Sequence, residues 1–357
     1  MQGNLVPEKT HPQVAARLER LPFSGFHKRL LVMGGLGYSF DAMDGAIIAF
    51  VLPVLIGLWG LSNVDAGIIA SATYIGYFFG ALVAGTAGDL IGRRIIMMWA
   101  LAIFCIASFA SAFATSWPVF FGLRVIAGFG IGAESVIIAP FLSEFVASRY
   151  RGSFVGSLAG FFSFGFLGAA VLGYLLVPAA DWGWQLAIVI TALPIVLLLW
   201  WRKALPESPR WLESEGRYKE ADAILTAIEQ EVSQQQGHSI PALAVDANPP
   251  EPPQAEVKEK SIANNFAALW SPVMAKITAM TWLLWTSITF SYYSFFTWIP
   301  TLLVQSGMTI TQSFGYSLGI YAAQIPGYYS AAYFNERIGR RSTIVSYLLL
   351  GSLSAVG

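Results

Sequence analysis

Gly85-Thr86-Ala87-Gly88-Asp89-Leu90-Ile91-Gly92-Arg93-Arg94 is a short charged segment between two long apolar runs. A second copy, Ala332-Tyr333-Phe334-Asn335-Glu336-Arg337-Ile338-Gly339-Arg340-Arg341, follows at an offset of 336 − 89 = 247 residues. The acidic residue, the glycine before the arginines and both arginines keep their places in the second copy. A repeat of this kind predicts a chain made of two related halves.

The composition is that of a membrane protein. Of the 357 residues, 55% are hydrophobic and 12% are charged, whereas a soluble domain carries about 25% charged residues. A helix needs roughly 20 apolar residues to cross a bilayer. Runs of that kind lie near 29–58, 66–90, 95–115, 118–146, 153–178, 183–202, 273–304 and 312–335, and a ninth begins near 342. The sequence therefore predicts an all-α polytopic protein of about nine spans, with a six-helix N-terminal half and an incomplete C-terminal half.

Basic residues separate the two sides of the predicted membrane region. Twenty of the 21 Lys and Arg residues fall in loops and tails on one side, and Arg124 is the exception. Because basic loops face the cytoplasm, the N-terminus and both repeat segments are expected on the cytoplasmic side of a bacterial inner membrane. The net charge of zero gives no indication of a nucleic-acid partner. We expect a cytoplasmic leader at 1–28, a six-helix bundle at 29–202, a cytoplasmic inter-half loop at 203–272 and the first part of the C-terminal bundle at 273–357.

The inter-half loop carries one helical pattern. Tyr218, Ala221, Leu225 and Ile228 recur at helical spacing between charged residues, which predicts a short amphipathic helix on the membrane or on the bundle. The segment at about 233–261 is rich in Gln, Pro and Glu and is expected to be a disordered linker.

Histidine and cysteine give no sign of a metal site. His11, His27 and His238 lie outside the predicted spans, and Cys105 is the single cysteine. We therefore expect no metal and no cofactor, and we take Cys105 as a small apolar packing residue.

Three acidic residues fall deep inside predicted spans, away from their basic ends, where ionisable groups are costly and often functional. Asp41 and Asp44 are three residues apart, so they share a helix face that should line a water-filled cavity. Asp41 and Glu134 both lie ~18 Å from the cytoplasmic ends of their helices, at ~1.5 Å per residue. Two acids at one depth suit a proton carrier, so Asp41, Asp44 and Glu134 are candidate proton-coupling residues. The alternative is structural hydrogen bonding or pairing with neighbouring helices.

Arg124 is the single Lys or Arg that lies in a predicted span away from its basic end. A permanently charged guanidinium there must face a partner or a ligand. One interpretation is a clamp for a substrate carboxylate, and the other is a fixed ion pair with Asp44. The two can coexist if substrate displaces the aspartate, and a snorkelling side chain is a third interpretation.

The seventh predicted span is unusually aromatic, with hydroxyl groups between the rings. Tyr292 and Tyr293 lie too deep for an interfacial aromatic belt, and adjacent residues point about 100° apart, so at most one should face a cavity squarely. Pro300 allows a broken helix, which transporters use at binding sites. Tyr321 and Gln324 in the eighth span complete the candidate substrate-binding residues, with core packing as the alternative.

Charged residues gather on the basic side. Asp89, Arg93, Glu144 and Arg151 are expected to meet there. The sixth span is followed by Leu205-Pro206-Glu207-Ser208-Pro209-Arg210-Trp211-Leu212, in which the prolines end the helix and Glu207 and Arg210 can pair with the nearby loops.

These motifs resemble known transporter families. The repeated G-x-x-x-[DE]-x-x-G-R-R pattern resembles the major facilitator superfamily, and 206–212 resembles a signature of sugar porters and organic-ion transporters. Together with Phe40–Asp44, Arg124–Gly152 and Phe290–Tyr293, they are similar to the bacterial niacin permeases, relatives of the synaptic vesicle glycoprotein 2 family and of aromatic-acid/proton symporters. That family has twelve spans, so we expect this chain to be a fragment or a truncated form that ends inside the ninth.

The resemblance implies a role for the charged loops. In the superfamily such charges form a cytoplasmic gate that holds the halves together when the protein is open outward. Carried over to this sequence, the gate residues are Gly85, Asp89, Gly92, Arg93, Arg94, Glu144, Arg151, Glu207, Arg210, Glu336, Arg340 and Arg341. The alternative is a charge cluster that only sets the topology.

The functional hypothesis is a monomeric secondary transporter, not an enzyme. The resemblance implies a proton-coupled importer of a small aromatic monocarboxylate such as nicotinate, working by alternating access. The alternatives are a sugar or another organic ion as substrate, and a transporter-like sensor or scaffold that binds without transport. No nucleophile–base set or phosphate loop indicates catalysis.

Overall fold

The computed structural model describes residues 13–237, 240, 267 and 269–356, and within these ranges the chain is helical with no strand. The helices are α1 (Val14–Glu19), α2 (Gly25–Trp59), α3 (Asn63–Ile91), α4 (Arg93–Ser111), α5 (Trp117–Ser143), α6 (Ser148–Leu176), α7 (Gly183–Thr191), α8 (Ile195–Ala204), α9 (Pro209–Ser214), α10 (Tyr218–Gln236), α12 (Ala275–Gln305), α13 (Ile310–Arg337) and α14 (Arg340–Val356). The predicted all-α class is confirmed. Most of the expected linker lies outside the described residues, as do His11 and His238.

Five of the described helices, α2 to α6, are long and apolar enough to cross a membrane. The predicted sixth span is instead two short helices, because α7 ends at Thr191 and α8 begins at Ile195. Pro194 stands between them and cannot donate the backbone hydrogen bond that would continue α7. In contrast, α12 continues without a break through Pro300, although a proline at this position is compatible with a broken helix.

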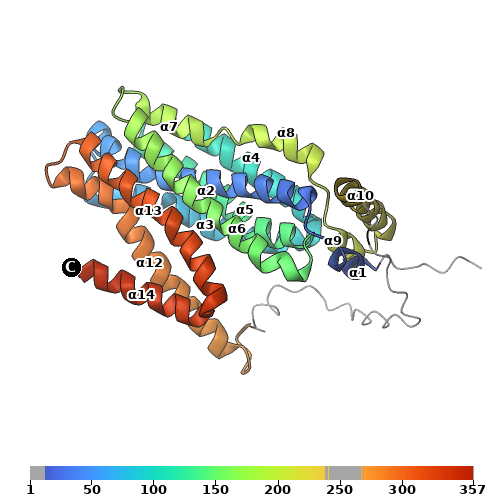
Figure 1. Cartoon of the computed structure of the whole chain (residues 1–357). Helices are drawn as coiled ribbons and strands as arrows, with labels where there is room; N and C mark the ends of the chain where they lie inside the picture. The colour runs from blue at the N-terminus through green and yellow to red at the C-terminus, as the bar shows by residue number, and fades with distance from the viewer. Residues whose placement is uncertain (1–12, 238–239, 241–266, 268, 357) are drawn as a thin grey trace, which may run out of the picture.

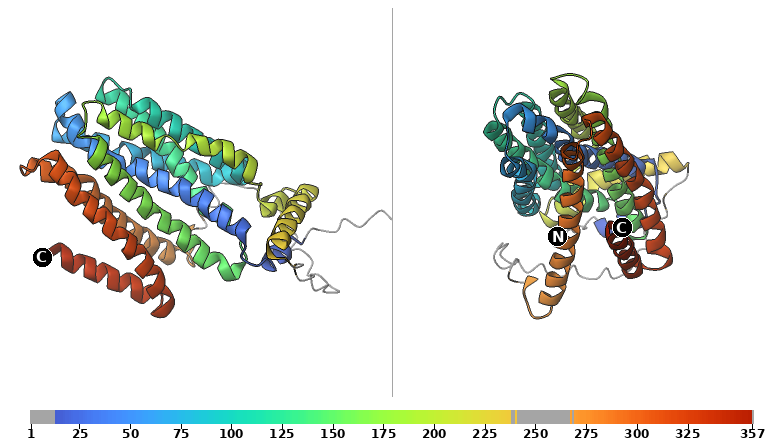
Figure 2. Two further views of the ribbon diagram at one scale, coloured as in Figure 1. Left: turned by 45° about the horizontal axis from the view of Figure 1, so that its top comes forward. Right: turned by 90° about the vertical axis from the view of Figure 1, so that its left-hand side faces the viewer.

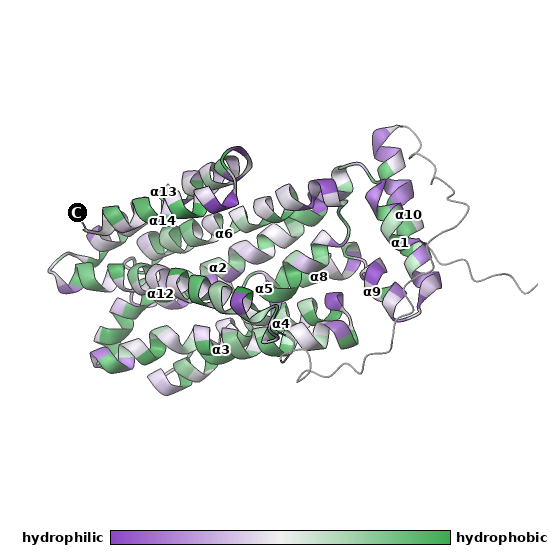
Figure 3. Cartoon of the chain, turned by 90° about the horizontal axis from the view of Figure 1, so that it is seen from below, coloured by the Kyte–Doolittle hydropathy of each residue, from purple (hydrophilic) through white to green (hydrophobic). Residues whose placement is uncertain are grey.

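Helices α2 to α8 form one bundle, and α12, α13 and α14 lie along one side of it (Figures 1 and 2). We call the end with α1, α9 and α10 the basic end, and the end with the loops at 60–62, 112–116 and 306–309 the opposite end. Figure 3 shows hydrophilic residues gathered on α1, α9 and α10 and hydrophobic residues along the bundle. Helices α12 and α13 lie against the bundle near the opposite end and diverge from it toward the basic end (Figure 1).

Glycines let α3 and α5 pack backbone to backbone. A Cβ added at Gly76 would lie 1.9 Å from the backbone oxygen of Val125, and one at Gly128 would lie 2.0 Å from that of Thr73. Any side chain at either position would push the helices apart, so these glycines serve close packing.

The amphipathic helix lies on the bundle, which settles the alternative left open by the sequence. Leu225 and Ile228 of α10 are buried and belong to one hydrophobic cluster with Leu18 of α1. Ion pairs surround this contact: Arg17 Nη2 lies 2.8 Å from Glu229 Oε2, and Arg20 Nη2 lies 2.5 Å from Glu229 Oε1. Helix α10 therefore holds α1 in place at the basic end.

Glu229 makes this attachment sensitive to acid. Burial alone would raise the pKa of Glu229, but hydrogen bonds from Arg17 and Arg20 outweigh it and hold the pKa below its usual range. Its contribution is therefore present above the ordinary glutamate pKa and is lost as the pH falls through the lowered value. We expect Glu229→Gln to lower stability by about 1 kcal/mol at neutral pH, and the difference from wild type to shrink in acid. Thermal unfolding in detergent at both pH values measures it.

Glu220→Gln is the matched control, because Glu220 lies on the same helix in an exposed pair with Arg217. It should change the melting temperature little. Equal losses in the two variants would show that burial of the Glu229 pair is unimportant.

Candidate functional site

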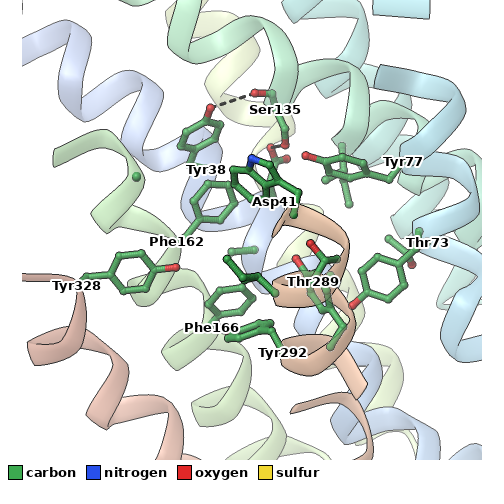
Figure 4. A pocket seen from close by; sticks show the side chains of 18 residues that line it. Tyr38, Asp41, Thr73, Tyr77, Ser135, Phe162, Phe166, Thr289, Tyr292 and Tyr328 are labelled. Atoms are coloured by element: carbon green, nitrogen blue, oxygen red, sulfur yellow. Dashed lines mark hydrogen bonds between the residues drawn. The ribbon is translucent and has the colours of Figure 1, made fainter. Parts of the chain in front are cut away.

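A cavity of about 470 Å³ lies where α12 and α13 meet α2, α3, α5 and α6 (Figure 4). Its walls are mainly aromatic, and both halves of the chain contribute to them. The lining residues are Tyr38, Asp41, Ala42, Gly45, Thr73, Tyr74, Tyr77, Ile131, Ser135, Ala159, Phe162, Phe166, Trp285, Ile288, Thr289, Tyr292, Tyr293 and Tyr328.

Asp41 is the one carboxyl group among these lining residues, and none of them is Lys, Arg or His. Ser135 Oγ donates a hydrogen bond of 3.3 Å to Asp41 Oδ2, and Tyr38 Oη donates one of 3.0 Å to the Ser135 carbonyl oxygen. Asp41 Oδ1 has no hydrogen-bond partner among the described residues. The cavity therefore presents one half-satisfied carboxyl group and no cation of its own.

Ring pairs shape the rest of the cavity. Tyr38 stacks on Phe162 with ring centroids 4.5 Å apart, and Tyr74 contacts Tyr293 across the two halves at 4.6 Å. Tyr292 and Tyr293 both line the cavity, although the helical angle between neighbours predicted that at most one would face it squarely. Both fit because α12 contacts α2 and also passes close to α3, so two of its faces are covered.

Aromatic residues close the cavity toward the opposite end. Phe50 of α2 is fully buried, and its ring centroid lies 5.1 Å from that of Phe314 and 5.8 Å from that of Tyr321. Tyr321 belongs to this aromatic cluster of Phe50, Phe314 and Tyr321, and it is not among the residues that line the cavity. Gln324 accepts a hydrogen bond of 3.0 Å from Tyr292 Oη, so it orients a lining residue. Toward the basic end, residues 279–290 of α12 are exposed.

Behind the cavity wall, Arg124 and Asp44 form a fully buried ion pair. Arg124 Nη2 lies 2.6 Å from Asp44 Oδ2, and Nη1 donates a second hydrogen bond of 3.1 Å to Oδ1. Ser108 and Thr191 donate to Asp44 Oδ1 at 2.6 and 2.7 Å. Of the interpretations of Arg124, the structure contains the ion pair. The carboxylate clamp stays a prediction.

Thr73 connects the ion pair with the cavity wall. Thr73 lines the cavity and also accepts a hydrogen bond of 3.1 Å from Arg124 Nη2. Asp41 lines the cavity and Asp44 does not, although the two share a helix face. Residues three apart still differ by about 60° around a helix, which directs Asp41 and Asp44 to different neighbours.

Glu134, the third candidate acid, is also absent from the cavity wall. Its side chain is fully buried on α5, and neither carboxyl oxygen has a hydrogen-bond partner among the described residues. Its neighbour Ser135 is the residue that reaches Asp41.

Three of the four charged residues expected to meet at the basic end, Asp89, Arg93 and Glu144, form ion pairs there, and Arg151 pairs with Glu19 instead. Arg93 pairs with Asp89 at 3.4 Å and with Glu144. Glu207 Oε1 accepts a hydrogen bond of 3.2 Å from the backbone N–H of Arg94. These contacts join α3, α4 and α5 to the segment before α9, and none of them involves a residue of the C-terminal bundle.

Gly92 has a structural reason to be glycine. Its φ of +112° lies in the region that favours glycine, and an added Cβ would lie 2.8 Å from Glu207 Oε2. Gly85 has open space around its Cα.

Arg151 and Arg210 have other partners than the Arg93 cluster. Arg151 Nη2 lies 3.8 Å from Glu19 Oε1, and Arg210 lies near both. Arg340 and Arg341 at the start of α14 are exposed, and no ion pair joins them to the N-terminal half among the described side chains. The side chain of Glu336 lies outside what the structure describes.

Comparison with known proteins identifies the family. Residues 23–356 match the family described as "Sugar (and other) transporter". The niacin transporter NiaP of Acinetobacter baylyi is 35% identical over 342 residues, which cover 96% of this chain and 74% of that protein. The chain belongs to the sugar (and other) transporter family. The expected major facilitator membership and the expectation that the protein is not an enzyme are therefore confirmed, and the protein is a membrane-embedded secondary transporter.

Two further relatives support the family and the fold. The putative niacin/nicotinamide transporter NiaP of Bacillus subtilis is 33% identical, with 90% of this chain and 70% of that protein covered. A crystal structure of a D-xylose–proton symporter superposes with a TM-score of 0.64 at 18% identity, over 88% of this chain and 70% of that one. The latter likeness shows the transporter fold.

For a transporter of this family, the sequence reasoning missed several lining residues. Tyr38 precedes Asp41 by three residues on α2, and Thr73 precedes Tyr77 by four on α3, so each pair shares one helix face. That spacing was available from the sequence. Phe162 also lines the cavity, and no sequence signal singles it out, because periodicity does not distinguish a cavity wall from a helix interface.

The buried pair gives the first prediction for this site. Asp44→Asn leaves the guanidinium of Arg124 buried without its counter-charge. Arg124→Gln likewise leaves the carboxylate of Asp44 buried without a counter-charge. Each single change should cost about 3–5 kcal/mol, and the double variant should cost less than the sum. A double-mutant cycle of unfolding in detergent measures the coupling.

Arg124→Lys distinguishes the two interpretations of Arg124, an ion pair with Asp44 and a clamp for a substrate carboxylate. It should weaken binding of nicotinate and of its uncharged amide equally if Arg124 only supports Asp44. A selective loss for the acid in titration calorimetry would instead favour the clamp.

Proposed function

We propose that this protein is a proton-coupled importer of a small aromatic monocarboxylate, with nicotinate as the first candidate, working by alternating access. The observation that carries the proposal is the cavity itself, which is walled by aromatic rings and contains a single carboxyl group, Asp41, and no cation among its lining residues. The similarity to niacin transporters supports the choice of substrate.

The dimensions and walls of the cavity suit a planar ring. A volume of about 470 Å³ lies within the usual range for small-molecule sites, about 300–1,000 Å³. Tyr38, Phe162 and Tyr292 offer ring faces, and aromatic pairs favour offset or edge-to-face contact. Thr73, Ser135 and Thr289 add hydroxyl groups that can fix the orientation of a polar substituent.

Asp41 links anion binding to a proton. An ionised Asp41 would repel a substrate carboxylate in the same cavity, whereas a protonated Asp41 can donate a hydrogen bond to it. The substrate anion therefore binds best when Asp41 carries a proton. In turn, a bound anion strengthens the binding of the proton to Asp41. Release to the basic end, which the excess of Lys and Arg assigns to the cytoplasm, completes the inward step.

The arrangement of the halves fits an inward-facing state. Phe50, Phe314 and Tyr321 close the opposite end, and α12 and α13 diverge toward the basic end (Figure 1). The charged cluster at the basic end is proposed to help close that end in the outward-facing state, where the two halves approach each other.

Asp41→Asn tests the coupling role. An amide cannot release or take up a proton, so the variant should lose concentrative uptake of nicotinate under an imposed pH gradient. Exchange of internal for external nicotinate should remain measurable, because exchange moves no net proton. Proteoliposomes loaded with nicotinate measure both. Asp181→Asn, which removes an exposed carboxyl group, should behave as wild type.

Accumulation by Asp41→Asn equal to wild type would make Asp41 a structural residue. Binding of nicotinate by the wild-type protein without any accumulation would favour a sensor or scaffold over a transporter.

Arg93→Ala tests the gate. The pairs of Arg93 with Asp89 and Glu144 are already present in the inward-facing arrangement, so the expected effect comes from losing the positive charge that is proposed to attract the other half in the outward-facing state. The variant should favour the inward-open state, with a shift of about 0–1 kcal/mol, or up to about fivefold in population. The measurement is labelling of Ala159→Cys, a lining position, by an impermeant thiol reagent in a Cys105→Ala background. Arg217→Ala removes an exposed pair elsewhere and serves as the control. Unchanged labelling from the basic side would leave the cluster with a topological role alone.

A further inference from the structure

Glu134 is a buried carboxyl group without a counter-charge. Its exposed fraction is 0%, and both oxygens lack hydrogen-bond partners among the described residues. A Cβ built on Gly37 of α2 would lie 2.6 Å from Glu134 Oε1 and 3.0 Å from Cη2 of Trp201 on α8. The carboxyl group therefore fills a space between α2, α5 and α8 that glycine leaves open.

The position of Glu134 connects it to Asp41. Gly37 precedes Asp41 by one helical turn, ~6 Å along α2, and the two acids interact electrostatically. Ser135, which follows Glu134 on α5, donates a hydrogen bond to Asp41 Oδ2. Asp41 lines the cavity (Figure 4) and Glu134 does not, so of the two acids Asp41 is the one in contact with the space open to water.

Within the part of the chain that the structure describes, no cation forms an ion pair with Asp41 or Glu134. The titratable groups that face Glu134 from neighbouring helices are Tyr38 and Asp41 on α2 and Cys105 on α4. The guanidinium of Arg124, ten residues from Glu134 on the same helix, is paired with Asp44 through two hydrogen bonds. Two unpaired carboxylates side by side in an apolar bundle would be costly, so each favours its neutral, protonated form.

We propose that Glu134 is a second proton-binding site of the transport cycle, so that one monocarboxylate anion enters with two protons. This inference rests on the proposed function. The proton of Glu134 reaches the cavity through Asp41: an O–H bond breaks at one carboxylic acid as another forms at the next acceptor, and no other bond changes. Loss of Asp41 therefore removes both protons from the cycle, whereas loss of Glu134 removes one.

The proton count determines the charge that crosses the membrane. One anion with two protons carries one net positive charge inward, so a membrane potential that is negative inside drives uptake. One anion with one proton carries no net charge, and the potential then has no effect on the final accumulation.

The test is nicotinate uptake by the full chain in proteoliposomes under a potassium diffusion potential. With equal pH on both sides, the wild-type protein should accumulate nicotinate about tenfold for each ~59 mV of potential. With the potential held at zero and a pH gradient of about one unit, accumulation should approach a hundredfold in wild type and tenfold in Glu134→Gln. Glu134→Gln should not respond to the potential, and its nicotinate exchange should persist because the amide mimics the protonated acid. Asp181→Asn should match the wild type.

The outcomes separate this inference from the proposed function. Wild-type uptake that follows the pH gradient but ignores the potential would overturn the second site and leave the proposed function standing. No accumulation under either gradient would overturn the proposed function itself. A Glu134→Gln variant that responds to the potential like wild type, or that loses exchange while folded, would overturn the assignment to Glu134. Where that variant fails to fold, the wild-type charge count still decides the number of protons, and Glu134→Asp, which keeps the acid, must retain the potential response.

Discussion

The buried pair between Arg124 and Asp44 is the interaction on which the N-terminal half depends. Both side chains are fully buried, and Thr73, Ser108 and Thr191 bond to one or both of them. Five helices, α2, α3, α4, α5 and α7, therefore meet at one pair of charges. Such a pair contributes little net stability compared with apolar packing, but losing one partner leaves a buried charge. The pair thus fixes which faces of these helices turn toward each other.

The pair also sets the chemistry of the other acids. Because the guanidinium of Arg124 is bonded to Asp44, Asp41 and Glu134 lie in the same bundle without a cation. Neutral acids can remain in an apolar interior, and they can exchange protons when water or a substrate reaches them. The aromatic cavity wall around Asp41 keeps this exchange next to the place where a ring would bind.

The two halves are held together differently from the helices within the N-terminal half. Inside that half, α3 and α5 approach backbone to backbone at Gly76 and Gly128, which allows little relative movement. Between the halves, ring pairs such as Phe50–Phe314 and Tyr74–Tyr293 form the contact. Apolar rings are not directional in the way that hydrogen bonds are, so they can slide as one half rocks on the other.

The sequence by itself determined the class, the repeat and the family. Apolar runs of membrane length, one-sided Lys and Arg residues and a charged segment repeated at 247 residues are local patterns, and each is imposed by the bilayer or by duplication. The sequence also identified the unusual residues, Asp41, Asp44, Arg124 and Glu134, because a charged residue within an apolar run is easily recognised.

The tertiary structure decided what contacts each of these residues makes. Asp41 and Asp44 are three residues apart, yet one lines the cavity and the other bonds to Arg124, and Tyr38, Thr73 and Phe162 join the cavity from three helices. The partner of a buried side chain depends on how neighbouring helices are rotated and how closely they approach, and the periodicity of a single helix does not contain that information.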